Sequence, residues 1–247
     1  METVEFSIQP LGDTGIIIQF GTEISEAIYQ QIRQYVYWLE QSCIEGIVEW
    51  VPAYTTLAVF YRPNIISYDE LSQKLLKIGE KIESMPVPDP IVIEIPTLYG
   101  KEAGPDIQFV AETNGLSVEE VVKIHSSSDY LIYMIGFVPG FPYLGGMDKR
   151  IAAPRKKTPR SRIPAGSIGI AGEQTGIYPL ETPGGWQIIG RTPVKLYDPQ
   201  KQDPILLKAG DYIRFVPITE REYEKIEQQV LKGSYKVAKY KKEAAET

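Results

Sequence analysis

Residues 136–146 read GFVPGFPYLGG, and residues 183–193 read PGGWQIIGRTP. Glycine and proline recur at short intervals through the whole of 136–193, which leaves no room for a long helix. This spacing is typical of many short strands joined by tight turns, as in a small β-barrel. Just before it, residues 130–137 (YLIYMIGF) form an almost unbroken apolar run, which predicts a strand buried on both faces.

A different pattern precedes residue 85. Short β-prone runs alternate with two segments of helical periodicity, and the second of these starts at a capping box formed by Ser67 and Glu70. The pattern predicts a compact β-β-α-β-β-α unit that closes at the proline-rich stretch MPVPDP, residues 85–90. We therefore expect an α+β N-terminal domain (1–85), a β-barrel domain (91–218) and a charged, helical or frayed tail (219–247).

Composition excludes several classes of protein. The net charge of -6 argues against a general nucleic-acid binder, which would usually be basic. The single cysteine, Cys43, cannot form an internal disulfide, and no Cys/His spacing suits a structural metal, so no metal site is expected. No stretch approaches the roughly 18 apolar residues of a membrane span, and the acidic N-terminus has no signal-peptide core. We expect a soluble, cytoplasmic protein that binds neither membrane nor nucleic acid.

Motifs for nucleotide and nucleophile chemistry are absent. The sequence has no phosphate loop, no dinucleotide fingerprint, no nucleophile elbow and no zinc-protease helix motif. Ser167 lies in the segment AGSI, but the single histidine lies elsewhere and no third partner is visible, which argues against a hydrolase triad. We expect the chain to bind no cofactor by itself.

A cationic stretch runs through the glycine- and proline-rich region of this acidic protein. Solvated loop charge is the usual fate of such runs and is the interpretation we favour for the lysines. Arg155, Arg160 and Arg162 differ because prolines or glycine-rich sequence bracket each of them, which would fix a guanidinium at low entropic cost. We interpret these three, together with Arg191, as contacts to an anion.

Two further residues allow two interpretations each. His125 is the only histidine and the candidate acid or base, yet its helical register with Val118, Val121 and Val122 also suits a hydrogen-bonded core histidine. Trp186 follows Gly184 and Gly185, and it is either an anchor in a groove that contacts a partner or a plug of the barrel core.

The two quoted stretches occur with PR at 154–155 and 159–160 and with IPAGS at 163–167. Together they resemble the B subunit of bacterial ATP-dependent 5-oxoprolinase, a family that includes the Kip-type histidine-kinase inhibitor and proteins like allophanate hydrolase subunit 1. The resemblance covers nearly the whole chain and implies that the barrel is cyclophilin-like. It also implies a complex with subunits A and C that uses ATP and Mg to hydrolyse 5-oxo-L-proline to L-glutamate.

On this resemblance, His125 is the candidate catalytic residue. The candidate substrate or anion contacts are Arg155, Arg160, Arg162, Ser167 and Arg191. The candidate groove or partner interface consists of Phe137, Phe141, Tyr143, Gly184, Gly185 and Trp186. An alternative function is a regulatory protein whose groove binds and inhibits a sporulation-type sensor histidine kinase. A third is membership of allophanate hydrolase or urea carboxylase, although no amidase Ser-Ser-Lys signature supports it.

Overall fold

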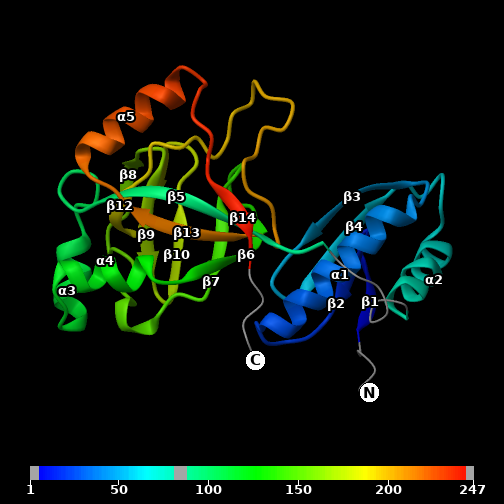
Figure 1. Cartoon of the computed structure of the whole chain (residues 1–247). Helices are drawn as coiled ribbons and strands as arrows, with labels where there is room; N and C mark the ends of the chain where they lie inside the picture. Colours follow the sequence, from blue (N-terminus) through cyan, green and yellow to red (C-terminus); the bar gives the residue numbers. More distant parts are fainter. Residues whose placement is uncertain (1–5, 81–87, 243–247) are drawn as a thin grey trace. The chain divides into compact units, whose positions relative to one another are not determined.

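The computed structural model describes residues 6–80 and 88–242. The chain divides into two compact units, Met1–Pro88 and Asp89–Thr247, and Figure 1 shows the elements of each. The division falls at the predicted linker 85–90, of which residues 85–87 lie outside the described residues. That the two units fold independently stays a prediction.

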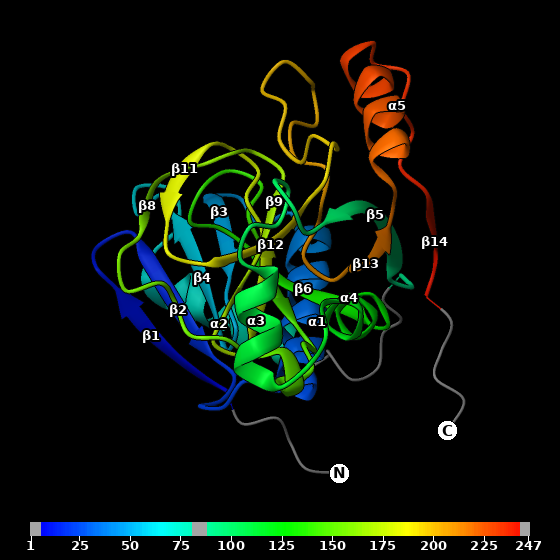
Figure 2. The ribbon, with the colours of Figure 1, turned by 90° about the vertical axis from the view of Figure 1, so that its left-hand side faces the viewer.

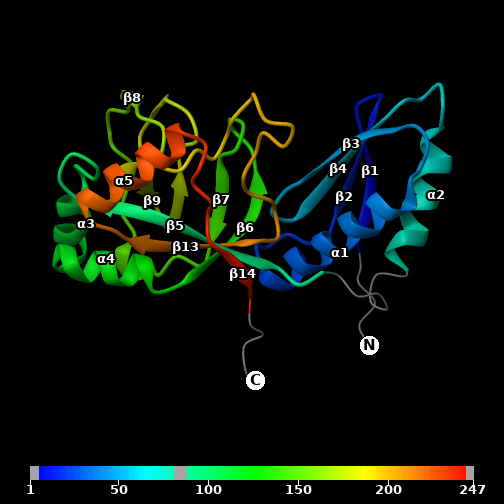
Figure 3. The ribbon, with the colours of Figure 1, turned by 45° about the horizontal axis from the view of Figure 1, so that its top comes forward.

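The first unit is a four-stranded antiparallel sheet with two helices. Its strands are β1 (Ser7–Leu11), β2 (Gly15–Gln19), β3 (Ile47–Pro52) and β4 (Thr56–Tyr61), in the order β1-β2-β4-β3. Helices α1 (Glu26–Ser42) and α2 (Tyr68–Gly79) pack on the face formed by alternate residues of β2 and β4, and Figure 3 shows α1 lying across the strands. The expected capping box at Ser67 and Glu70 is present and starts α2.

The second unit is built on one large sheet. Its strands are β5 (Ile91–Tyr99), β6 (Asp129–Ile135), β7 (Pro142–Gly145), β9 (Ser167–Ala171), β10 (Gln174–Ile177), β12 (Gln187–Arg191) and β13 (Tyr212–Pro217). They follow the order β10-β9-β12-β5-β13-β6-β7. The two ends of this order, β10 and β7, lie side by side, so the sheet nearly closes into a barrel. The barrel predicted from glycine and proline spacing is confirmed to that extent.

Shorter elements cover the barrel. Helices α3 (Ile107–Asn114) and α4 (Val118–Ser126) and the 3-10 turn η2 (Lys149–Ile151) pack together beside it, while β8 (Arg160–Ile163) and β11 (Thr182–Gly184) form a separate two-stranded ribbon. Helix α3 packs on β12 and helix α4 on β13, and Figure 2 shows both helices beside these strands. Strand β11 of this ribbon carries two residues, Pro183 and Gly184, of the pocket described below.

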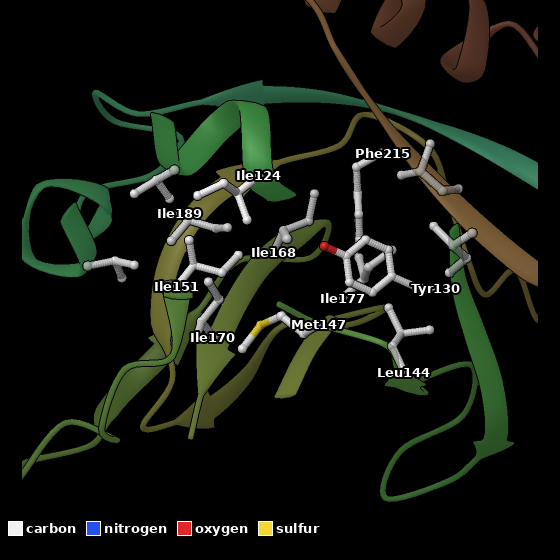
Figure 4. Packing of buried hydrophobic residues seen from close by; sticks show 14 of the residues in the cluster. Ile124, Tyr130, Leu144, Met147, Ile151, Ile168, Ile170, Ile177, Ile189 and Phe215 are labelled. Carbon is white, nitrogen blue, oxygen red and sulfur yellow. The ribbon is translucent and has the colours of Figure 1, made fainter. Parts of the chain in front are cut away.

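The barrel interior is a dense aliphatic and aromatic core (Figure 4). Strands β5 and β13 run parallel at its centre and bury Ile93, Ile95, Ile213 and Phe215 almost completely. Side chains from β9, β10 and β12 fill the opposite wall, with Ile124 of α4 closing the cluster from outside. Burial of this kind contributes roughly 25 cal/mol per Å² of apolar surface removed from water, which makes the core the main source of the unit's stability.

The segment expected as a charged tail contains a helix, α5 (Glu220–Leu231), and a strand, β14 (Lys239–Lys241). Helix α5 starts at a capping box formed by Thr219 and Glu222, has no buried residue, and lies outside the barrel strands in Figures 1 and 2. Strand β14 pairs antiparallel with Ile91–Ile93 of β5. The sequence did not indicate this strand because Lys-Tyr-Lys is short and has no apolar alternation.

We expect a fragment of residues 89–247 to fold without the first unit. Each unit has its own apolar cluster, and none of the clustered residues of one is a member of the other's cluster. Thermal unfolding and amide-dispersion NMR of the two fragments, compared with the whole chain, provide the measurement. A barrel fragment that shows no cooperative unfolding transition would contradict two independent folding units.

Candidate functional site

A pocket of about 350 Å³ opens between the β8–β11 ribbon, the 137–143 turn and the start of β12. It is lined by Phe137, Phe141, Tyr143, Arg155, Lys156, Pro159, Gln174, Tyr178, Pro183, Gly184, Gly185 and Trp186. The structure therefore brings Arg155 together with all six residues that the sequence placed in a groove.

One wall of the pocket is an aromatic cluster centred on Phe141. Its ring meets those of Tyr143, Tyr178 and Trp186 edge to face, at centroid distances of 5.2, 5.6 and 5.8 Å. Gly176 lies beneath it, where an added Cβ would come within 3.1 Å of both Phe141 and Trp186. Interlocked rings of this kind leave few alternative rotamers, so the wall is preorganised.

Phe137 stands out from this cluster. Its side chain is 68% exposed, and its backbone adopts φ +66, which is uncommon for a bulky residue. A tight turn imposes this conformation, with Val138 N donating to Gly136 O at 2.8 Å. Backbone strain of this kind costs on the order of 1–3 kcal/mol and concentrates at binding sites. The ring forms the exposed edge of the pocket and meets Phe141 at 5.8 Å.

Tyr178 lies deeper in the same wall. Burial raises the pKa of its phenol to about 12, although a hydrogen bond from the Trp186 amide and the nearby charges of Arg155 and Arg160 act in the opposite direction. The phenol is therefore neutral at physiological pH. A Cβ at Gly184 would lie 2.5 Å from the Tyr178 hydroxyl, so glycine is required there for the strand to approach this closely.

The cations around the pocket differ in their partners. Within the described part of the chain, Arg155 has no ion-pair partner, and its side chain lies on the pocket lining. Lys156 Nζ lies 3.1 Å from Asp106 Oδ1, and Arg160 approaches both oxygens of the same carboxylate at 2.8 Å. Arg155 is thus the guanidinium best placed to meet an anionic ligand.

The remaining predicted anion contacts lie elsewhere. Arg162 pairs with Glu181 at 2.6 Å on the surface, and Arg191 Nε donates to Ala165 O at 3.0 Å. Ser167 is 2% exposed within β9 and faces Arg191 in the strand register. Trp186 directly precedes β12 and Arg191 ends it, and a strand rises about 3.3 Å per residue, so the two cannot share this pocket. Four of the five predicted anion contacts therefore do not line the pocket: Arg160, Arg162, Ser167 and Arg191.

His125 is fully buried and does not line the pocket. Its Nδ1 lies 2.7 Å from the Tyr99 hydroxyl and its Nε2 lies 2.8 Å from Thr175 Oγ1. Since Thr175 donates to Gly169 O, its oxygen accepts from Nε2–H, and Tyr99 donates to Nδ1. Burial lowers the pKa of the imidazole to about 3. This position favours the alternative interpretation, a hydrogen-bonded core histidine, and a catalytic role for His125 stays a prediction.

Sequence reasoning missed Asp106, Tyr178 and Gln174. Asp106 was visible only as a residue after Pro105 at the start of a helix, a pattern that usually denotes a cap. Tyr178 and Gln174 belong to short strands and turns in which no spacing rule separates pocket-facing residues from others. Among the residues that the structure describes, no group of three or more His, Cys, Asp or Glu side chains could hold a metal ion. In those same residues no helix has the length and apolarity needed to cross a bilayer.

Comparison with known proteins first defines the class. Residues 6–207 match the family described as carboxyltransferase domain, subdomain C and D. Solved structures have the same fold. The crystal structure of TTHA0988 is 36% identical in sequence with a TM-score of 0.74, and the match covers 83% of this chain and 40% of TTHA0988. The urea amidolyase of K. lactis, 21% identical with a TM-score of 0.77 over 97% of this chain and 16% of its own, shares the fold.

Curated relatives narrow this class. The 5-oxoprolinase B subunit of Bacillus subtilis (strain 168) is 46% identical over 235 residues, which cover 90% of this chain and 96% of that protein. The protein of the same name from Escherichia coli O157:H7 is 40% identical over 85% of this chain and 95% of its own length. The chain belongs to the family of 5-oxoprolinase B subunits, which confirms the resemblance drawn from its motifs.

Proposed function

We propose that this chain is the B subunit of an ATP-dependent 5-oxoprolinase and acts with subunits A and C to hydrolyse 5-oxo-L-proline to L-glutamate. The observation that carries the proposal is identity of 37–46% to three curated proteins of that name, along nearly their whole length. In this proposal ATP and Mg are used by the complex in the cytoplasm, and the barrel of this chain is cyclophilin-like.

The pocket suits such a substrate. 5-Oxoproline combines a carboxylate with a small, flat lactam ring. Arg155 would bind the carboxylate through charge-assisted hydrogen bonds, while the rings of Phe141 and Trp186 would contact the lactam. At about 350 Å³ the pocket has the size of a small-molecule site.

The lining also indicates what this chain does not supply. None of the described lining residues is Asp, Glu, His, Ser or Cys. Of the remaining groups that could move a proton, Lys156 is paired with the Asp106 carboxylate and burial raises the pKa of Tyr178 to about 12, so neither is a ready general base. In the proposed reaction ATP transfers its terminal phosphoryl group to the lactam oxygen and leaves as ADP. One water attacks the activated carbon and the ring C–N bond breaks, with the nitrogen taking up a proton, which gives an acyl phosphate of glutamate. A second water hydrolyses this acyl phosphate and releases glutamate and phosphate. This chain would bind and orient the ring and shield it from bulk water, and the groups that move protons would come from its partners.

Reconstitution tests the proposal. The chain is purified alone and with subunits A and C from the same source, and 5-oxoproline-dependent release of ADP and glutamate is measured with ATP and Mg. We expect no turnover by the isolated chain and turnover by the complex. An inactive, properly assembled complex would overturn the proposed function, and turnover by the isolated chain would overturn its role as a dependent subunit.

Within that complex, Arg155→Gln is expected to raise the KM for 5-oxoproline by tenfold or more. The reason is the loss of a hydrogen bond to a charged group, which contributes about 1.5–3 kcal/mol. The matched control is Lys157→Gln, which removes one exposed cation that does not line the pocket. Equal KM values for both variants would remove Arg155 from the substrate site.

A further inference from the structure

Asp106 lies just before α3 and is only 7% exposed. It occupies the N-cap position of this helix, yet its side chain makes no capping hydrogen bond. Its oxygens turn toward three other groups instead. Oδ2 accepts from Ile188 N at 2.7 Å, and Oδ1 accepts from Arg160 Nη2 at 2.8 Å and from Lys156 Nζ at 3.1 Å.

These three donors belong to different parts of the pocket wall. Lys156 lines the pocket itself. Arg160 begins β8, whose partner strand β11 carries the lining residues Pro183 and Gly184. Ile188 follows Trp186 by two residues in β12.

Backbone bonds reinforce the same junction. Lys156 N donates to Gly185 O at 2.7 Å, and Asp106 N donates to Ile188 O at 2.8 Å. Asp106 is therefore paired with Ile188 through both its amide and its carboxylate. The buried Asp106 carboxylate thus connects Lys156, the β8–β11 ribbon through Arg160, and strand β12 through Ile188.

The charge of this cluster favours an anionic ligand. One carboxylate faces two cations, so the three side chains leave one net positive charge, and Arg155 adds another at the lining. Burial alone would raise the pKa of Asp106, but the hydrogen bonds from Arg160, Ile188 and Lys156 outweigh it and hold the pKa below its usual value. The carboxylate is therefore ionised whenever the protein is folded near neutral pH.

We propose that Asp106 is a positioning residue for this pocket: it holds Lys156, Arg160 and the Trp186 segment in the arrangement that binds an anionic substrate. The identity of that substrate as 5-oxoproline rests on the proposed function.

Asp106→Asn separates positioning from simple electrostatics because the two predict opposite signs. The substitution preserves volume and removes one negative charge close to the pocket. If charge alone mattered, an anion would bind more tightly and KM would fall. If Asp106 positions the wall, the lysine and arginine lose their common acceptor and KM rises.

In the reconstituted complex we expect Asp106→Asn to raise the KM for 5-oxoproline at least tenfold, with a smaller change in kcat. Asp148→Asn is the matched control, since Asp148 also pairs with an arginine, Arg150, whereas Asp106 also pairs with the lining residue Lys156. Arg160→Lys keeps the charge and loses the two-pronged contact, and it serves if Asp106→Asn does not fold. We expect it to raise KM severalfold. A KM that falls or stays unchanged in the folded variants overturns the proposal.

A second readout keeps this test independent of the enzyme activity. With Trp38 and Trp50 replaced by phenylalanine, fluorescence reports Trp186 alone. Replacing Trp38 breaks no hydrogen bond of its buried Nε1 to any residue that the structure describes. Asp106→Asn should at least double the acrylamide quenching of Trp186, whereas Asp148→Asn should leave it unchanged. If the wild-type complex is inactive, the proposed function fails, and the positioning role of Asp106 is then tested by the quenching of Trp186. Equal quenching in Asp106→Asn and in the wild type overturns that role.

Discussion

Trp186→Ala is expected to lower the free energy of unfolding by about 3–5 kcal/mol, the cost of removing a large aromatic side chain from a packed core. Trp186 is only 9% exposed, and its ring meets Phe141 at 5.8 Å and Tyr178 at 6.3 Å. It also covers Gly176, where an added Cβ would lie 3.1 Å away. This burial favours the core-plug interpretation over a partner anchor.

Denaturant unfolding of the variant measures the loss, and Trp186→Phe is the control because it keeps an aromatic ring at the same place. We expect the phenylalanine variant to lose less than half as much stability. A Trp186→Ala chain that unfolds like the wild type but no longer assembles with the other subunits would reverse the interpretation in favour of a partner anchor.

The second large effect concerns acid. Unfolded histidine binds a proton near pH 6.5, whereas burial keeps the pKa of His125 at about 3 in the folded chain. Between these values the unfolded state binds one more proton than the folded state. The contribution of His125 to the free energy of unfolding is therefore fully present above about pH 6.5. It falls by about 1.4 kcal/mol for each pH unit below that value.

Denaturant unfolding between pH 7.5 and 4.5 measures this slope, in a range where most carboxylates stay ionised. His125→Gln is the comparison, because glutamine cannot titrate and retains a donor for Thr175. We expect it to be less stable at neutral pH and to lose most of the slope. Identical slopes in the two proteins would show that the acid sensitivity arises elsewhere.

The sequence predicts a structural feature well when that feature depends on residues close together in the chain. The capping box at Ser67 starts a helix as expected, since a cap involves only residues three positions apart. The glycine- and proline-rich region indicates a barrel because turn chemistry is local as well. The aromatic lining residues other than Tyr178 were predicted for the same reason, since they flank those turns.

Long-range pairing explains the failures. Nothing around Arg160 shows that its partner is Asp106, 54 positions earlier. Arg162 and Arg191 have the same proline- or glycine-rich flanks as Arg155, yet a surface carboxylate and a backbone carbonyl hold them away from the pocket. The sequence shows which side chains carry charge, whereas the fold decides which charges are already neutralised.

The parallel pairing of β5 with β13 has a consequence for biosynthesis. The amide of Ile91 donates to Asp211, 120 positions later, and β14 joins β5 later still. On a ribosome, β5 emerges long before either neighbour, while the first unit is already complete. Contacts of such separation fold slowly, and an apolar strand that waits for its partners is prone to pair with other chains. Until β13 and β14 have left the exit tunnel, nascent β5 therefore lacks two of the strands that pair with it in the folded chain.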